Sequence, residues 1–263
     1  MRVVTLGDLL LDVIVRLDEP LASGADANAT TRVGAGGQAA NVAAWVVALG
    51  GEARCVALHG DDAAGTLVAG ELQQRGVELA AGPAAGRTGV VISLVSTDGE
   101  RTLASDRGIA TSLEPDDLDP GWFACDCLHI SGYALLASPI DAAAVRAAEL
   151  ARGYGAQISL DLSAWTRIRA TTSFRDRLET LAPEVVFGNE DEWDAVGDVA
   201  ATRIVKRGAG GFEVDTVQCQ APDVSVVDTT GAGDALAAGF LVGGPQLAVE
   251  AAARCVGQLG AMP

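Results

Sequence analysis

The chain of 263 residues carries a net charge of −17, from 18 Lys and Arg against 35 Asp and Glu. This acidic excess argues against nucleic acid and anionic membranes as partners. Hydrophobic residues make up 49% of the chain, and no uninterrupted apolar run reaches the length of a membrane span, so we predict a folded cytoplasmic protein. The five scattered cysteines and two histidines lack zinc-site spacing, which favours reduced thiols.

Apolar runs rich in β-branched residues alternate with helical patterns along the chain. The strands are predicted at residues 2–7, 53–60, 127–132, 156–163, 184–189, 201–208 and 223–228. The helices are predicted at residues 38–51, 61–76, 139–155, 190–197 and from about 232 onward. This alternation predicts a doubly wound α/β fold, with a mostly parallel sheet flanked by helices.

Two segments, residues 13–34 and 87–107, interrupt this alternation. Both are rich in Val, Thr and Ser around turns such as TDGE at residues 97–100, and neither has a helical period. They predict two β-hairpins that form one small sheet, a lid inserted in a single domain spanning residues 1–263. The open edge of such a lid would also pair two chains into a homodimer.

Polar residues cluster where the predicted strands end. These clusters are Asp8 with Asp12, Gly36 with Gly37, Asp161, Asn189–Glu192, Lys206–Gly211 and Asp228–Asp234. Open parallel sheets bind ligands outside the carboxyl ends of their strands. We therefore expect these clusters to form one ligand site.

The stretch DTTGAGD at residues 228–234 is a turn of small residues before an apolar helix. The amides of Gly231, Ala232 and Gly233 would point from the helix start toward an anion. Asp234 follows in the first helical turn, where it either accepts a proton or simply complements the helix dipole; spacing alone leaves both interpretations open. The chain has neither the P-loop motif nor a dinucleotide fingerprint after the first strand, which excludes those nucleotide sites.

Four motifs in the same order resemble one known family. DTTGAGDALAAGF resembles the C-terminal signature of the ribokinase-like, or PfkB-type, carbohydrate kinases, and GAGGQAANVAAWVVALGG resembles their N-terminal glycine signature. Between them, GNEDE matches the family's N-x-x-E motif and IVKRGAGGF its nucleotide-loop strand and turn. The resemblance covers residues 2–260 and implies transfer of a phosphoryl group from ATP to a hydroxyl of a sugar-like molecule.

The resemblance also implies roles for individual residues on the nucleotide side. Asp234 resembles the catalytic base, and the amides of Gly231, Ala232 and Gly233 resemble the anion hole for the transferred group. Asn189 and Glu192 resemble the pair that arranges Mg²⁺, with Glu192 acting through water. The positions that match the nucleotide lining are Lys206, Gly208 and Gly211.

On the substrate side, the residues that match the family's sugar site are Asp12, Gly36, Gly37 and Asn41. Asn41 is also interpretable as an exposed polar residue of a helix start. Asp228 and Thr230 match positions where some members hold a monovalent cation such as K⁺. Arg107 in the lid is either a substrate contact or a solvated charge.

Several functions remain open at this stage. The resemblance favours phosphorylation of a primary hydroxyl of a sugar or sugar acid, although Gln38 replaces the lysine common in ribokinases proper. A nucleoside kinase of the same family is the alternative, with Tyr133 and Trp165 near predicted strand ends as candidates for stacking a base. A non-catalytic sensor on the same fold is disfavoured because Asp234 and the glycine turn are present.

Overall fold

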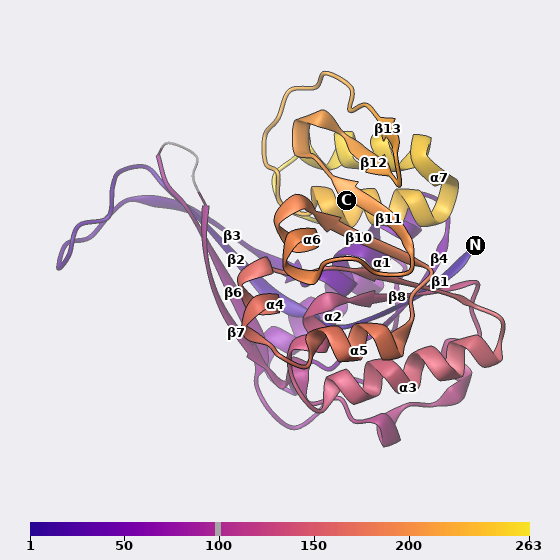
Figure 1. Ribbon diagram of the computed structural model, residues 1–263. Coiled ribbons are helices and arrows are strands. Elements are labelled where there is room, and N and C mark those ends of the chain that lie inside the picture. Colours follow the sequence, from indigo (N-terminus) through magenta and orange to yellow (C-terminus); the bar gives the residue numbers. More distant parts are fainter. Residues whose placement is uncertain (98–100) are drawn as a thin grey trace.

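The computed structural model describes residues 1–97 and 101–263 (Figure 1). Its larger sheet has nine strands in the order β13-β12-β11-β10-β9-β8-β1-β4-β5. The strands are β1 (Arg2–Leu6), β4 (Glu52–Val56), β5 (Glu78–Ala80), β8 (Cys127–Ser131), β9 (Gln157–Asp161), β10 (Val185–Asn189), β11 (Thr202–Lys206), β12 (Phe212–Val214) and β13 (Val217–Cys219). In this sheet the seven strands β5, β4, β1, β8, β9, β10 and β11 are parallel, and β12 and β13 continue it at one edge as antiparallel strands.

Helices cover both faces of this sheet, as predicted. They are α1 (Gln38–Ala48), α2 (Ala63–Gln74), α3 (Ile140–Gly153), α4 (Trp165–Ala170), α5 (Phe174–Leu181), α6 (Glu190–Val196) and α7 (Ala232–Val256). The core on one face includes residues of α1 and α7, and that on the other includes residues of α3 and α5 (Figure 1). Short 3₁₀ turns complete the backbone: η1 (Ile109–Thr111), η2 (Pro115–Asp117), η3 (Pro120–Phe123), η4 (Gly132–Leu136) and η5 (Gly208–Gly210).

Local sequence explains where individual helices begin and bend. Asp62 caps α2, because its carboxylate accepts a hydrogen bond of 2.8 Å from the Gly65 amide. Among the described residues, α7 is the helix whose length and composition would suit a membrane span. Its torsions are non-helical at Gly243 and Gly244, and much of its surface is buried in the core, so it is a bent core helix.

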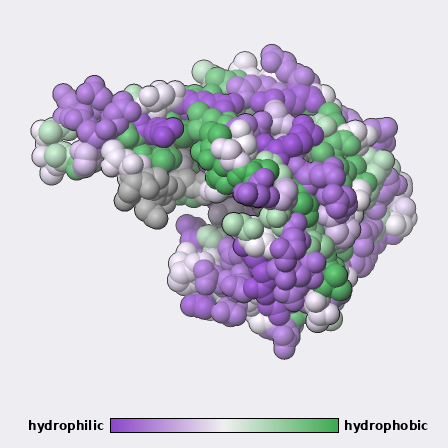
Figure 2. Space-filling view, turned by 90° about the horizontal axis from the view of Figure 1, so that it is seen from above, coloured by the Kyte–Doolittle hydropathy of each residue, from purple (hydrophilic) through white to green (hydrophobic). Residues whose placement is uncertain are grey.

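The two predicted hairpins form one sheet with the strand order β3-β2-β6-β7. Its strands are β2 (Leu10–Leu17), β3 (Ala29–Gly36), β6 (Thr88–Val95) and β7 (Arg101–Gly108). Parallel pairing of β2 with β6 joins the hairpins, which confirms the prediction of a single lid sheet. The lid projects from the body as an arm, with a recess beneath it in the space-filling view (Figure 2). The predicted turn at 97–100 falls mostly outside the described residues.

The strand predicted at residues 223–228 is wrong, because this segment is extended coil. Val224, Val226 and Val227 are 39%, 60% and 56% exposed, so their alternation with polar residues marks no buried face. An apolar run forms a strand only where a neighbouring strand and a core receive it. The patterns also missed the short strands β5, β12 and β13 and the helices α4 and α5.

Candidate active site

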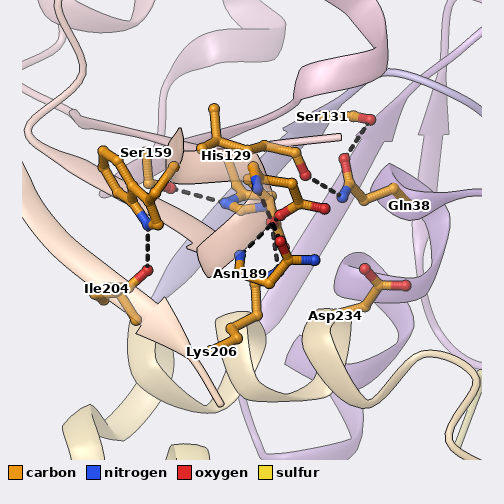
Figure 3. Close-up of polar contacts among 12 residues, drawn as sticks. Gln38, His129, Ser131, Ser159, Asn189, Ile204, Lys206 and Asp234 are labelled. Atoms are coloured by element: carbon orange, nitrogen blue, oxygen red, sulfur yellow. Dashed lines mark hydrogen bonds and ion pairs between the residues drawn. The ribbon is translucent and has the colours of Figure 1, made fainter. Parts of the chain in front are cut away.

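The larger sheet brings the predicted polar clusters to one edge. Asp161, Asn189 and Lys206 are the last residues of the adjacent strands β9, β10 and β11. Asp234, in the first turn of α7, lies near Asn189 and Lys206 (Figure 3). Residues up to 73 positions apart in the chain therefore lie together at the carboxyl ends of the strands, which is the expected place for a ligand site.

The glycine turn before α7 has no space for larger residues. Gly231, the N-cap, has a φ of 78°, and a Cβ there would lie 2.6 Å from the Cα of Ala261. A Cβ on Gly233 would lie 3.0 Å from the Lys206 ammonium nitrogen. The Ala232 amide donates to the Thr229 carbonyl at 3.3 Å, within the turn. The turn thus presents backbone at a helix start, the usual setting for binding an anion, but the Ala232 amide that was predicted to bind it is engaged within the turn.

Asp234 lies against the N-terminal half of α1. The side-chain amide of Asn41 donates a hydrogen bond of 2.7 Å to Asp234 Oδ2. The pKa of Asp234 is raised to about 8, first by burial and then by the nearby Asp161 carboxylate, while the hydrogen bond from Asn41 and the Lys206 ammonium act to lower it. The other polar atom of Asn41, Oδ1, is buried and has no hydrogen-bond partner in the described part of the chain. Asn41 therefore orients Asp234 and leaves one acceptor free.

Lys206 forms a buried ion pair with Asp161. Its Nζ lies 2.5 Å from Asp161 Oδ1, and Asp161 is fully buried. Burial raises the pKa of Asp161 despite the ammonium group. Burial acts to lower the pKa of Lys206, but the carboxylates of Asp161 and Glu192 outweigh it and hold that pKa above its usual value. We name this group, Asp161, Lys206 and Asp234, the floor cluster.

Asn189 and Glu192 form a reciprocal cap at the start of α6. The Glu192 amide donates to Asn189 Oδ1 and the Asn189 amide donates to Glu192 Oε2, each at 2.9 Å. Burial raises the pKa of Glu192 to about 7, while Lys206 acts to lower it. No set of three His, Cys, Asp or Glu side chains that would hold a metal alone occurs within residues 1–97 and 101–263.

The predicted nucleotide loop is a tight turn between β11 and β12. Gly208 and Gly211 have φ values of 55° and 84°. A Cβ on Gly211 would lie 2.0 Å from the Cys219 carbonyl oxygen, whereas one on Gly208 would meet nothing within 4 Å. Gly211 is therefore required for packing, and Gly208 faces open space beside the loop.

On the substrate side, Gly36 and Gly37 allow two close contacts. A Cβ on Gly36 would lie 2.1 Å from the carboxyl carbon of Asp12, and one on Gly37 would lie 2.4 Å from the Asp8 carbonyl oxygen. Asp12 also lines a cavity of about 440 Å³ between the lid, α2 and residues 260–262. Asp12 and Asn41 were predicted to line one sugar pocket. Asn41 does not line this cavity, and its side-chain amide is hydrogen-bonded to Asp234.

Arg107 joins the lid to the body. Its Nη1 lies 2.6 Å from Asp8 Oδ2, and its guanidinium carbon lies 3.9 Å from the centre of the Tyr133 ring. Asp8 is 5% exposed, so this pairing compensates a buried carboxylate. Sequence reasoning placed Asp8 and Asp161 at strand ends but gave neither a partner. Their position at the end of a predicted strand was the one feature of the sequence that indicated a place in the site.

Asp228 and Thr230, the candidate cation ligands, bond to each other. Asp228 Oδ1 accepts hydrogen bonds from the Thr230 amide and hydroxyl, at 2.9 and 2.6 Å. Asp228 Oδ2 accepts one of 3.0 Å from the Gly260 amide. Asp228 therefore fixes the turn that precedes Gly231.

Comparison with known families identifies this arrangement. The pfkB family carbohydrate kinase model matches residues 1–262, so the chain belongs to that family and is a phosphotransferase with a hydroxyl acceptor. An ATP-dependent ribose-1-phosphate kinase of Halopiger xanaduensis is 34% identical over 97% of this chain and 90% of its own length. A fructokinase of Klebsiella pneumoniae is 30% identical over 79% of this chain and 76% of its own length. The adenosine kinase structure from Sinorhizobium meliloti superposes with a TM-score of 0.89 at 25% identity, covering 99% of this chain and 95% of its own.

Proposed function

We propose that this protein transfers the terminal phosphoryl group of ATP to a hydroxyl, primary in our assignment, of a sugar or sugar acid. The observation that carries this proposal is the position of Asp234, which directly follows the Gly231–Gly233 turn and is held by Asn41. A base and an anion site are thereby adjacent, as phosphoryl transfer requires. Its setting is the cytoplasm, consistent with five cysteines that are all free thiols.

Asp234 is the proton acceptor in this mechanism. The acceptor hydroxyl gives its proton to the Asp234 carboxylate as its oxygen bonds to the γ-phosphorus, and the bond from that phosphorus to the ADP oxygen breaks. The Gly233 amide, at the helix start, faces the negative charge of the transferred group. A base is most effective when its pKa lies near the working pH, and a pKa of about 8 meets this condition.

Glu192 and Asn189 are the residues that we assign to Mg²⁺. Oε1 of Glu192 takes no part in the reciprocal cap, and Oδ2 of the neighbouring Asp161 is buried with no hydrogen-bond partner among the described residues. Carboxylate oxygens near retained waters suit Mg²⁺. When bound, the ion would offset charge on the phosphates of ATP. Gly208 and Gly211 would line the nucleotide. Lys206, which is paired with Asp161, would contribute its positive charge from within the floor cluster.

Asp12, Gly36, Gly37 and Asn41 are the residues that we assign to the sugar. Gly36 lies against the Asp12 carboxylate in the lid, and Gly37 follows it directly before α1. Asn41 lies on α1 and donates its hydrogen bond to Asp234. A nucleoside acceptor is the second candidate, and the adenosine kinase neighbour is the observation in its favour. Against it, the guanidinium of Arg107 lies over the ring of Tyr133, so that face is taken. We therefore favour a sugar over a nucleoside.

An ADP-release assay with a panel of acceptors tests this proposal. The panel contains free pentoses and hexoses, sugar acids, sugar phosphates and nucleosides, each with ATP and Mg²⁺. We expect sugars or their derivatives to give higher kcat/KM than any nucleoside. A nucleoside with much the highest kcat/KM would replace the sugar assignment, and an ATPase signal unaffected by every acceptor would contradict acceptor phosphorylation itself.

A further inference from the structure

The cavity that Asp12 lines has a second polar wall, which belongs to α2. Glu71, Gln74 and the C-cap Arg75 all line it, and their spacing of three and four residues places them on one helix face. Leu72, by contrast, is fully buried in the core. A volume of about 440 Å³ is typical of small-molecule sites, and none of the roles assigned above uses this polar face.

Glu71 and Asp12 border the cavity beside the same glycine. Asp12 on β2 pairs with Gly34 on β3. A Cβ on Gly34 would lie 3.3 Å from Glu71 Oε2, so the glycine leaves room for this carboxylate against the lid. Oε2 of Glu71 accepts a hydrogen bond of 3.0 Å from the Ala35 amide, whereas Oε1 accepts none from the described residues. A ligand that Asp12 holds in this cavity therefore also meets Glu71.

Gln74 adds a side chain that both donates and accepts hydrogen bonds. It is exposed, lines the cavity, and makes no side-chain hydrogen bond with any residue that the structure describes. A carboxamide has one acceptor oxygen and two N–H donors, so it bonds a hydroxyl in either direction. The preceding residue, Gln73, is also exposed but does not line the cavity. The chain thus offers two neighbouring glutamines, of which one faces the cavity.

The charges on the cavity wall balance. Asp12 and Glu71 carry two negative charges, and Arg32 and Arg75 carry two positive ones. Both guanidiniums also donate to backbone carbonyls of residues 259–263, which holds that wall in place. Among the described residues no aromatic ring lines the cavity, so it offers no surface for stacking a base. Such a wall suits an uncharged molecule with several hydroxyls, because each hydroxyl donates and accepts.

We propose that Glu71, Gln74 and Arg75 are specificity-determining residues, which bind hydroxyls of the acceptor that do not react. This inference rests on the proposed function, from which it takes the base Asp234 and the sugar residue Asp12. The reacting hydroxyl lies at Asp234, the next hydroxyls lie at Asp12, and the far end of the acceptor reaches α2. Selectivity among acceptors then depends on a helix outside both the lid and the glycine signature.

The test compares Gln74→Ala with Gln73→Ala, using D-ribose and D-fructose as acceptors with ATP and Mg²⁺. D-fructose is longer by one carbon and its hydroxyl, so it should depend more on α2. We expect Gln74→Ala to lower kcat/KM for D-fructose about 3-fold to 10-fold through KM, the worth of one neutral hydrogen bond, and to affect D-ribose less. Gln73→Ala should alter neither sugar, and the KM for ATP should stay the same in both variants.

Glu71→Gln is the second variant. Glutamine keeps an oxygen for the Ala35 amide but removes the charge that faces the cavity. We expect it to weaken D-fructose binding about 10-fold in calorimetry without nucleotide, since hydrogen bonds to a charged group are the stronger ones. Urea denaturation should give the same midpoint as in the parent protein, which separates loss of binding from loss of structure.

Three outcomes would overturn this assignment: no binding of either sugar, an unchanged ratio of the two kcat/KM values in Gln74→Ala, or equal effects of the two alanine variants. Binding and turnover together separate it from the proposed function. If D-fructose binding depends on Glu71 and Gln74 but no acceptor is phosphorylated, the binding role of α2 stands and the proposed function fails. If both sugars are phosphorylated with kcat/KM independent of Glu71 and Gln74, the proposed function stands and the role of α2 fails.

Discussion

Two ion pairs with buried carboxylates lie at the strand ends, and they differ in what surrounds them. Asp161 and Lys206 pair at the floor, where Asp234 and Glu192 add further negative charge near the ammonium. Asp8 and Arg107 pair where the lid meets the body, against the face of Tyr133. Under the proposed function, the floor pair would set the charge around the base, whereas the lid pair would position donors for the acceptor. The same kind of contact would then serve turnover in one place and substrate affinity in the other.

Breaking the floor pair should have the larger effect on stability. Asp161→Asn leaves a buried ammonium without its closest partner, and we expect it to lower the free energy of unfolding by about 3 kcal/mol, since Glu192 and Asp234 remain near. The double variant with Lys206→Met should recover part of this loss in urea denaturation. Glu149→Gln, in an exposed pair with Arg146, is the control and should cost less than about 0.5 kcal/mol.

The same substitution should change the pH dependence of turnover. The Asp161 carboxylate raises the pKa of Asp234, which is about 8, so its removal lowers that pKa. Turnover requires the ionised base and rises with pH through its pKa. The rising limb of kcat in Asp161→Asn should therefore lie at lower pH than in the parent protein. An unchanged limb would show that Asp161 does not act on the base.

Breaking the lid pair should alter acceptor affinity with little effect on chemistry. Arg107→Met removes the guanidinium but keeps an apolar side chain against Tyr133, and we expect the KM for the acceptor to rise about 10-fold to 100-fold. The KM for ATP and kcat should change much less. Arg87→Met is the control, because Arg87 pairs with Asp106 on the same lid at exposed positions. Equal effects of the two variants would remove the distinction between floor and lid.

The fold was more predictable than the contacts within the site. Alternating apolar runs indicated the parallel sheet, and the absence of helical period over residues 13–34 and 87–107 indicated the lid. The valines of residues 223–228 led to a wrong strand prediction, because a strand also needs a neighbouring strand, and the segment's own sequence does not show whether one is present. Partners such as Asp161 with Lys206 depend on the order of strands in the sheet, which local patterns do not specify.

Asn41 shows this limit in a single candidate residue. Its position in the glycine signature suggested an amide for the sugar, whereas its Nδ2 donates to Asp234 across 193 residues of chain. Sequence pattern predicted that Asn41 belongs at the site. Only packing of α1 against α7 assigns the direction of its amide.

Asp228 tests whether the turn itself matters, and its effect should be smaller. Asp228→Asn cannot accept hydrogen bonds from both Thr230 and Gly260 as the carboxylate does, so we expect a loss of about 1–3 kcal/mol in stability. Turnover should fall less than on changing Asp234. Because protein donors already engage both oxygens, activity should be equal in potassium and choline salts. Activity that requires potassium would restore the cation role for Asp228 and Thr230.

Association through the lid should be the weakest effect. Val33 and Ile92 both pair with Val13, share one lid face with it, and are 48% and 39% exposed. The predicted contact is the open edge of the lid; we propose that this exposed apolar face contributes to pairing with a second copy of the chain, and we expect sedimentation to show a dimer whose population falls on Ile92→Lys. A monomer at high concentration would contradict it.

Asp234→Asn tests the central claim most directly, with turnover, nucleotide binding and unfolding measured on the same preparation. Asn caps a helix as well as Asp does but does not accept the proton. We predict that kcat falls about 10²-fold to 10⁴-fold while ATP binding persists. The pKa of Asp234 is about 8 in the folded protein, above its value in the unfolded chain. Ionisation of Asp234 therefore lowers the free energy of unfolding as the pH rises toward 8. Asp234→Asn lacks this loss and should be more stable than the parent protein at pH 8. Near-normal turnover of Asp234→Asn would contradict its role as the base.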